Sequence, residues 1–347
     1  MSITIIGAGL SGLLTGYLLK KEGISFKILE ARNRVGGRIN TVYATNKAPV
    51  EMGATWFTRQ HKQLIGLLEE LEIEYFEQRM DNTVFYETSA VSPAQLVQTP
   101  SQAPSFRISG GTSSLIHALL HKLDATNVLF NQSVNHIKIN KNTVEVRTEK
   151  TFESNSVILA IPPKLWAKNI VFDPLLPADL MGVAIQTQTW MEDSIKIALT
   201  YDEPFWGQGN LPGTLFSNSG PITELYDHSN HKRSKYALCG FIASSLKNLT
   251  YTDRRENVIT QLKKVFGVRA TAFTSYEECV WSKEKNTFEP CDTFLYPHQN
   301  NGNPIFSKSY LDNTLFISSS ESAPEFSGYM DGAVYSANRI VEKIIKT

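Results

Sequence analysis

The chain contains only three cysteines, Cys239, Cys279 and Cys291, in 347 residues. They are too few and too widely spaced for a disulfide framework or a four-cysteine zinc site, and they suit a reducing cytoplasm. One pair of histidines has i, i+4 spacing, His117 and His121, but it lacks the acidic residue that a zinc-protease helix carries. We therefore interpret the pair as ordinary residues flanking a helix and expect no metal site.

An excess of charge of one sign is also missing. Lysine and arginine together number 34, and so do aspartate and glutamate, so nothing indicates a nucleic-acid or anionic-membrane partner. No apolar run is long enough to span a bilayer. The apolar N-terminus lacks the basic region of a secretory signal and is interrupted by glycines and a serine. We therefore expect a soluble, cytoplasmic protein, and the length of the chain favours two interleaved domains.

The most informative segment that is present is ITIIGAGLSG, in which Gly7, Gly9 and Gly12 have the spacing GxGxxG after a short apolar run. A helix with an apolar stripe follows, and then a second strand, FKILE, that ends on Glu30. The first glycine permits a tight turn, the second lets the backbone approach a pyrophosphate, and the third lets helix and strand pack closely. The helix N-terminus faces the phosphates and the acidic residue binds a ribose hydroxyl. The segment therefore predicts a dinucleotide site.

A second glycine pair follows in EARNRVGGRINT, where Arg32, Arg34 and Arg38 flank Gly36 and Gly37. Such a loop can bring more backbone and a cation to the same pyrophosphate. Together, GAGLSG and EARNRVGGR resemble the flavin-dependent amine oxidase family, which includes monoamine and polyamine oxidases. The resemblance implies FAD as the cofactor, with noncovalent contacts from Gly7, Gly9, Gly12, Glu30, Arg32, Gly37 and Arg38.

The resemblance continues along the chain. The segment EMGATWF is similar to the family's loop beside the flavin ring, which implies contacts from Gly53, Ala54, Thr55 and Trp56. Val134 stands where the family contacts the adenine half of FAD through its backbone. Trp281 resembles the tryptophan that packs near the flavin, and an ordinary core indole is the alternative.

The C-terminal run LFISSSESAPEFSGYMDGAVYSANRIVEKIIKT is the part most similar to the family. The resemblance implies that Glu321 contacts the phosphate–ribitol region of FAD and that Tyr329 faces the substrate. The final helix would begin near Met330, with its free N–H groups directed at the flavin. Since the chain stops after Thr347, we expect no C-terminal membrane anchor like that of mitochondrial monoamine oxidases.

The segment SIKIALTYDEPFW alternates like a half-buried strand, with Lys196 on the more polar face. Taken alone, this pattern favours a solvated lysine. However, the segment is similar to the family segment whose lysine holds a water against flavin N5, so we expect Lys196 to be an active-site residue. A buried ammonium there can stabilise negative charge that develops on the flavin.

Three features depart from the family. Between Tyr75 and Ser109, where the family usually inserts a long helical part of its substrate domain, the chain has a strand-like TVFYET and a loop rich in Pro, Ser and Gln that is typical of a linker. Asp292 occupies the place of a substrate-facing aromatic residue, so we include it among the expected catalytic residues, since its charge can pair with a cationic substrate. Cys291 lies near the place of the cysteine that binds flavin covalently in monoamine oxidases, but its spacing from Trp281 differs by one residue, which favours a free thiol.

The resemblance implies an α/β fold with a Rossmann-like FAD-binding domain (residues 1–76, 105–187 and 283–347) and a smaller mixed-sheet α+β substrate domain (77–104 and 188–282). It implies an FAD-dependent oxidase that transfers a hydride from the α-carbon of an amine to flavin N5. An imine and, on reoxidation by dioxygen, hydrogen peroxide would result. One alternative is an oxidoreductase of the same fold that acts on a dihydronicotinamide, as renalase-like proteins do, or on another non-amine substrate. Another is a flavin-bound sensor with little turnover.

Overall fold

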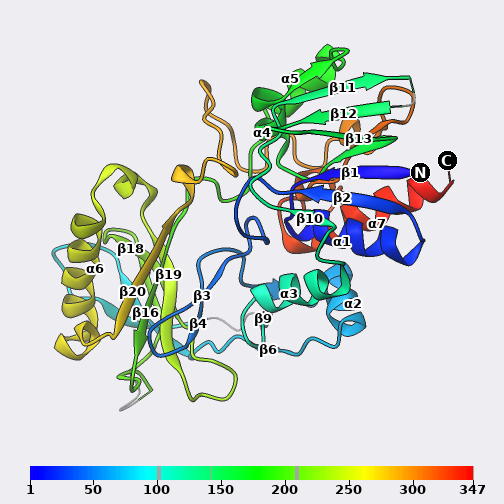
Figure 1. The fold of residues 1–347 in the computed structure, drawn as a ribbon. Helices are drawn as coiled ribbons and strands as arrows, with labels where there is room; N and C mark the ends of the chain where they lie inside the picture. The colour runs from blue at the N-terminus through cyan, green and yellow to red at the C-terminus, as the bar shows by residue number, and fades with distance from the viewer. Residues whose placement is uncertain (100–102, 142, 208–210, 347) are drawn as a thin grey trace.

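The computed structural model describes residues 1–99, 103–141, 143–207 and 211–346, which form two lobes (Figure 1). The larger lobe contains a parallel sheet of five strands in the order β10-β2-β1-β14-β21. Its strands are β1 (Ser2–Ile6), β2 (Ser25–Leu29), β10 (Val128–Leu129), β14 (Ser156–Leu159) and β21 (Leu315–Ile317). The first strand and the last strand of the described chain therefore belong to one sheet, and the N-terminus lies near the end of α7 in Figure 1.

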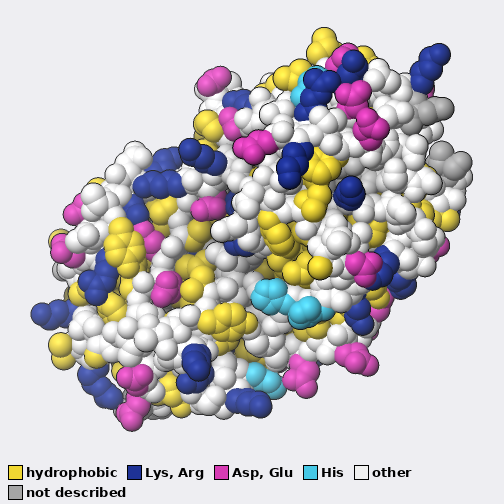
Figure 2. All heavy atoms as spheres, in the orientation of Figure 1, with side chains coloured by type: hydrophobic (Ala, Val, Ile, Leu, Met, Phe, Trp, Pro, Cys, Tyr) yellow, Lys and Arg dark blue, Asp and Glu magenta, His cyan; other side chains and the backbone are white. Residues whose placement is uncertain are grey.

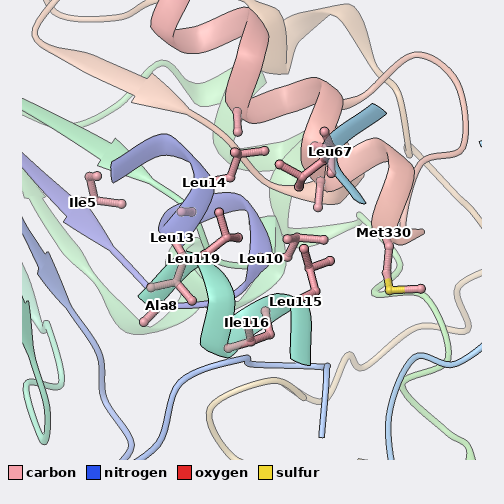
Figure 3. Close-up of a cluster of buried hydrophobic side chains, with 14 of the residues drawn as sticks. Ile5, Ala8, Leu10, Leu13, Leu14, Leu67, Leu115, Ile116, Leu119 and Met330 are labelled. Carbon is pink, nitrogen blue, oxygen red and sulfur yellow. The ribbon is translucent and has the colours of Figure 1, made fainter. Parts of the chain in front are cut away.

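Four helices pack over one face of this sheet. They are α1 (Leu10–Lys21), α2 (Lys62–Glu70), α3 (Ser113–Lys122) and α7 (Met330–Lys346). Figure 3 shows the core that they share, in which the labelled side chains are Ile5, Ala8, Leu10, Leu13, Leu14, Leu67, Leu115, Ile116, Leu119 and Met330. Each fully buried leucine contributes about 1.5–3 kcal/mol relative to an exposed one. This packing fixes the N-termini of α1 and α7 against the sheet.

The opposite face of the parallel sheet is covered by a second layer. A four-stranded sheet has the order β13-β12-β11-β15, with β11 (His136–Asn140), β12 (Thr143–Arg147), β13 (Thr151–Ser154) and β15 (Val171–Asp173). Helices α4 (Pro163–Asn169) and α5 (Ala178–Ile185) complete the layer. Leu159 of the parallel sheet and Trp166 of α4 are both fully buried in the core between these layers. All four residues of the strand SVIL are buried because both faces of the parallel sheet are covered.

The smaller lobe is built on a seven-stranded sheet of order β20-β16-β19-β18-β17-β7-β8. Its strands are β7 (Thr83–Glu87), β8 (Gln95–Gln98), β16 (Ile195–Tyr201), β17 (Leu215–Ser217), β18 (Ile222–Asp227), β19 (Tyr236–Ile242) and β20 (Ser275–Val280). Helix α6 (Tyr251–Phe266) packs on one face, and a capping box between Thr250 and Asp253 starts it. The other face is turned toward the larger lobe.

Short elements connect the two lobes. Strands β3 (Thr41–Tyr43) and β4 (Pro49–Glu51) form a hairpin, while β5 (Phe57–Thr58), β9 (Ser105–Ile108) and β6 (Tyr75–Glu77) form a three-stranded sheet. The short 3₁₀ helices of the described residues are η1 (Ser244–Asn248), η2 (Val268–Thr271), η3 (Trp281–Lys283), η4 (Pro304–Ser307) and η5 (Ser320–Ser322). Among the described residues, no helix is long and apolar enough to cross a membrane.

The α/β fold and the strand-turn-helix-strand order at the N-terminus agree with the prediction. The linker predicted after TVFYET was wrong in one part, because Gln95–Gln98 form strand β8 paired with β7. All four residues of β8 are exposed, so their polar composition reflects an edge strand and not an irregular loop. Residues 100–102 of the same segment lie outside the described part of the chain.

Candidate active site

A cavity of about 2310 Å³ lies between the two lobes and is lined by residues of both. It extends from the glycine-rich turn after β1 to the seven-stranded sheet. Figure 2 shows the surface hollowed between the lobes, where hydrophobic side chains gather. Because drug-sized ligands fill roughly 300–1,000 Å³, the cavity has room for an extended dinucleotide together with a substrate.

The turn between β1 and α1 requires glycine at two positions for steric reasons. Gly7 has a φ of +101°, and a Cβ there would lie 2.5 Å from Cγ2 of Ile161. A Cβ on Gly12 would lie 2.0 Å from the carbonyl oxygen of Gly7, so only glycine lets α1 begin this close to β1. Gly9 lines the cavity, and a Cβ there would meet no atom within 4 Å. The backbone at Gly9 is therefore open to a ligand.

The N-terminus of α1 is suited to bind an anion. Gly9 is its N-cap and supplies no side-chain hydrogen bond, and the first turn contains no acidic residue. The unpaired N–H groups and the positive end of the helix dipole therefore remain available at the cavity. These are the features with which helix N-termini bind phosphate groups.

The second glycine loop lies directly against the first. The N–H of Gly36 donates to the carbonyl oxygen of Ala8 at 2.8 Å, and Gly37 has a φ of +57°. The guanidinium of Arg34 donates to the carbonyl oxygens of Val35 and Gly37, at 3.1 and 3.0 Å. Arg34 thus holds the loop in shape, which leaves Arg32 and Arg38 as the cations of this loop that line the cavity.

Glu30 ends β2 at the cavity and is 4% exposed. Its two carboxylate oxygens accept hydrogen bonds from the N–H groups of Ala8 and Arg32, at 2.8 and 2.9 Å, so the acid is fixed beside the glycine turn. The guanidinium of Arg32 donates to Oγ1 of Thr287 at 2.8 Å and to the carboxylate of Glu284 at 3.2 Å. Arg32 therefore joins the predicted ribose end of the site to residues 284–287.

Arg38 reaches across the cavity to η5. Its Nη1 lies 2.6 Å from Oε1 of the fully buried Glu321, and Nη2 donates to Oγ of Ser320 at 2.7 Å. Glu321 does not line the cavity itself, and its ion pair fixes the guanidinium of Arg38, which does line it. The neighbouring Ser319 does line it, is 2% exposed, and its Oγ has no hydrogen-bond partner among the described residues. A buried hydroxyl without a partner fits a site that a polar ligand completes.

Lys196 lies on the cavity face of β16 and is 2% exposed, so the solvated position that its strand alone favours is wrong. Its Nζ donates to the carbonyl oxygen of Gly53 at 2.5 Å and contacts Oγ1 of Thr55. It also lies 4.8 Å from the ring centroid of Trp56 and 5.6 Å from that of Phe241. Aromatic faces and oxygen acceptors together hold the cation in place.

A group of buried titratable residues surrounds Lys196. Burial lowers the pKa of Lys196, and the nearby Cys239 and Glu51 oppose that shift. Burial also raises the pKa of the Glu51 carboxyl and of the Cys239 thiol, and it lowers the pKa of Arg107 to about 10. Low solvent access therefore governs the electrostatics on this side of the cavity.

His228 belongs to the same buried region, and its burial holds the pKa of the imidazole well below its usual value, with Arg107 and Lys196 adding to the shift. The unfolded chain binds a proton at this histidine below about pH 6.5, whereas the native chain does not, so acidification favours unfolding. When the pH is lowered from 7.5 to 5.5, the free energy of unfolding should decrease in both proteins. We expect the decrease in His228→Gln to be about 1.4 kcal/mol smaller than in the unmodified protein. Denaturant unfolding at both pH values measures this, with the exposed His117→Gln as the matched control. Equal losses in all three proteins would contradict the expectation.

The N-terminus of α7 reaches the cavity at Gly328, Tyr329 and Met330. Gly328 has a φ of +84°, and a Cβ there would lie 2.5 Å from Cβ of Trp190. The Trp190 ring also lines the cavity, with its centroid 5.6 Å from that of Tyr329, and it stacks at 3.9 Å on His298. Trp190 and His298 were not predicted to lie at the site, because they are far apart in the chain and belong to no motif.

Several other predicted residues come together at the cavity. Those that line it are Gly53, Ala54, Thr55, Trp56, Val134 and Trp281. Trp281 is 5% exposed and its Nε1 donates to the carbonyl oxygen of Met52 at 2.8 Å. Asp292 and Cys291 are not among the lining residues; Asp292 is exposed, and Sγ of Cys291 lies 3.5 Å from Oγ1 of Thr293. The structure therefore does not bring Asp292 to the other predicted catalytic residues.

The residues present fit FAD. A helix N-terminus without acidic residues, the open backbone at Gly9 and the unpaired Oγ of Ser319 suit the phosphates and ribitol. Glu30 is placed for a ribose hydroxyl, and Val134 lines the same end of the cavity. The flavin ring would then lie between the Gly53–Trp56 loop and the start of α7.

Comparisons with known proteins agree with this site. A family model described as "Flavin containing amine oxidoreductase" matches residues 10–107 and 86–345. The chain is 22% identical to a probable flavin-containing monoamine oxidase A of Dictyostelium discoideum, over 99% of this chain and 97% of that one. It is also 22% identical to flavin-containing amine oxidase B of Homo sapiens, over 99% of this chain and 86% of the human protein.

The solved structure of wild-type putrescine oxidase bound to putrescine has the same fold, with a TM-score of 0.86, 21% identity and full coverage of both chains. The family match extends over most of both lobes, and the relatives favour neither a dihydronicotinamide oxidase nor a sensor. The chain therefore belongs to the family of flavin-containing amine oxidoreductases and is an FAD-dependent enzyme that oxidises amines.

Proposed function

We propose that the enzyme is an oxidase whose amine substrate lies between the start of α7 and the cavity face of the seven-stranded sheet. The observation that carries the proposal is the position of Lys196, buried in the same cavity as the dinucleotide turn and held on the Gly53–Thr55 segment. FAD held by these residues would supply the redox chemistry, as the acceptor of a hydride from the α-carbon of the amine and the donor of electrons to dioxygen, which would leave as hydrogen peroxide.

In this proposal residues 1–76, 105–187 and 283–347 bind FAD, and residues 77–104 and 188–282 form the substrate side. The parallel sheet and the glycine loops belong to the first set, whereas the seven-stranded sheet belongs to the second. The cytoplasmic location that the low cysteine content favours remains a prediction.

Tyr329 and Trp190 orient the substrate in this proposal. Their rings give the cavity two aromatic surfaces at the start of α7, with centroids 5.6 Å apart. Burial raises the pKa of Tyr329, so its hydroxyl stays protonated and can donate a hydrogen bond. An amine that enters in the neutral form needs no strong general base, and the protein contributes orientation and exclusion of water.

Lys196 contributes electrostatics. Its ammonium can stabilise negative charge that develops at the reacting edge of the cofactor, and it can orient a water for the reaction with dioxygen. Such charge stabilisation is strong in a site with little water. The carbonyl of Gly53 and the hydroxyl of Thr55 fix the direction of the ammonium before the substrate arrives.

An anaerobic titration tests the proposal. The visible spectrum of the bound flavin is recorded while monoamines, diamines, NADH and NADPH are added one at a time. Bleaching by amines supports the proposal, and hydrogen peroxide should appear once air is admitted. Bleaching by the nicotinamides alone would overturn the proposal in favour of the renalase-like alternative. If no compound bleached the flavin, the proposal would also be wrong, and the result would favour a flavin-bound sensor with little turnover.

The role of Tyr329 gives a second prediction for the same assay. We expect Tyr329→Ala to lower kcat/KM for the preferred amine about 10- to 100-fold, because burial of one ring is worth about 1.5–3 kcal/mol. Tyr329→Phe keeps the ring and should stay within a few-fold of the unmodified enzyme. Tyr335→Ala, on the same helix but outside the cavity lining, is the matched control. Equal activity of Tyr329→Ala and the control would remove Tyr329 from substrate orientation.

A further inference from the structure

A row of side chains crosses the seven-stranded sheet on its cavity face. The register pairs Lys196 of β16 with Phe241 of β19, Phe241 with Glu224 of β18, and Glu224 with Phe216 of β17. All four residues line the cavity. Glu224 thus stands two strands away from Lys196, which is about 9–10 Å at the usual strand spacing.

A β-bulge directs Glu224 into the cavity. The register between β18 and β19 shifts between Ile222 and Glu224, so one extra residue is inserted there. Ile222 and Leu225 are fully buried in the core beneath α6, whereas Glu224 and Tyr226 line the cavity. Bulges of this kind redirect side chains next to active sites.

One oxygen of Glu224 is held and the other is free. The hydroxyl of Tyr226 donates to Oε2 of Glu224 at 2.8 Å, and among the described residues no hydrogen bond reaches Oε1. Burial raises the pKa of Tyr226, with Glu224 adding to the shift, so this hydroxyl remains a donor. The Tyr226 ring packs edge-on against Trp56 at 5.2 Å and against Phe216 at 5.7 Å. The Glu224 carboxylate is therefore bonded to a member of an aromatic cluster that lines the same cavity, a setting that favours an organic cation.

Most other acids of the cavity lining are already occupied by cations or amide groups. Glu30 accepts two backbone N–H groups, and both oxygens of Glu192 accept from the buried Lys164. Asp81 pairs with Arg79, and Glu289 accepts from a side-chain amide. Glu77 lies on β6 outside the sheet row and is exposed. Glu224 combines a position on the seven-stranded sheet with a carboxylate oxygen that accepts no hydrogen bond from the described residues.

We propose that Glu224 binds the distal ammonium of a short aliphatic diamine whose other, neutral amine is oxidised beside Lys196 and Tyr329. The inference rests on the proposed amine oxidation and adds the substrate class to it. A monoamine of the same length leaves Oε1 of Glu224 without a hydrogen-bond donor, so the site selects for the second cation. A hydrogen bond to a charged group is worth about 1.5–3 kcal/mol, which corresponds to about 10- to 150-fold in affinity.

The experiment compares 1,4-diaminobutane and 1,5-diaminopentane with 1-aminobutane and 1-aminopentane. We expect the unmodified holoenzyme to prefer the diamines, and Glu224→Gln to lose about 10- to 100-fold in kcat/KM for diamines with little change for monoamines. Tyr226→Phe should lower kcat/KM for the diamines to a smaller extent, because it removes the hydrogen bond that holds Glu224 but keeps the carboxylate. Glu277→Gln, on β20 of the same sheet but outside the cavity lining, is the matched control.

Binding without turnover provides a second readout. Calorimetric titration of 1,4-diaminobutane into enzyme whose flavin has been reduced with dithionite should give weaker binding for Glu224→Gln by the same factor. If monoamines and diamines react equally well and Glu224→Gln matches the control, the diamine inference is wrong while amine oxidation stands. If no amine bleaches the unmodified enzyme, the proposed function has failed, and a loss of diamine binding to reduced Glu224→Gln would still identify a dication site.

Discussion

Replacing Gly12 by alanine is expected to give a protein that neither binds FAD nor keeps its full stability. The added Cβ would lie 2.0 Å from the carbonyl oxygen of Gly7 and 3.3 Å from Cβ of Ala160, so α1 must move away from the sheet. Forced packing of this kind costs roughly 1–3 kcal/mol and occasionally more. Because the same movement displaces the N-terminus of α1, the phosphate-binding N–H groups are lost with it.

Gly9→Ala separates cofactor binding from folding. A Cβ at this position meets no protein atom within 4 Å, and Gly9 has a φ of −74° that alanine adopts readily. The apoprotein should therefore keep its stability within about 0.5 kcal/mol. If a pyrophosphate lies against this backbone, the methyl group blocks its approach, and FAD affinity should fall about 10- to 150-fold through one lost charge-assisted hydrogen bond.

Two measurements on each variant decide the matter: the ratio of flavin to protein absorbance after purification, and the melting temperature of the apoprotein. Gly66→Ala is the matched control, because Gly66 is exposed in α2 and a Cβ there also meets no atom within 4 Å. If Gly9→Ala retained FAD as fully as Gly66→Ala, the predicted pyrophosphate position would be wrong.

Local sequence carried the strongest predictions. The spacing of Gly7, Gly9 and Gly12 predicted the tight turn. The atoms that exclude a side chain at Gly7 and Gly12 belong to the turn itself and to residues 160–161 after the adjoining strand. Likewise, the alternation around Lys196 predicted which side chains face the core, because a strand has a period of two. What the alternation could not tell was whether the polar face met water or the other lobe, and only the family resemblance corrected that.

Features that depend on pairing between distant segments were not predictable from one sequence. Trp190 and His298 meet beside Tyr329 from positions more than a hundred residues apart, and no local pattern marks them. The direction of Glu224 depends on a bulge between β18 and β19, which is a property of two strands together. Asp292 shows the opposite failure, since placing it at the family's substrate-facing aromatic position put an exposed residue into the expected site.

Replacing Lys196 by methionine is expected to slow one half-reaction of the flavin about 10²- to 10³-fold, the usual cost of removing one preorganised charge or donor from an active site. Anaerobic stopped-flow reduction by the preferred amine and subsequent reoxidation by dioxygen identify which half-reaction depends on the ammonium. Lys27→Met, on the exposed side of β2, is the matched control and should leave both rates unchanged.

The fold should tolerate Lys196→Met. A buried charge exchanged for an apolar side chain of similar volume is often neutral or stabilising, although the carbonyl of Gly53 and the hydroxyl of Thr55 each lose a donor. A melting temperature close to that of the unmodified protein, together with slow flavin chemistry, would therefore assign the effect to the missing ammonium and not to unfolding.

The pH dependence completes the argument for Lys196. Burial lowers the pKa of its ammonium, so the charged form is lost at a lower pH than for an exposed lysine. If the charged form is the active one, the affected rate in the unmodified enzyme must fall as the pH rises through this lowered pKa, and the fall must be absent in Lys196→Met. Lys196 would have no role in the mechanism if Lys196→Met showed the same alkaline decrease as the unmodified enzyme. The same would hold if the rates of both half-reactions were equal in the variant and the unmodified enzyme. Its burial over the Trp56 ring would then be a structural contact only.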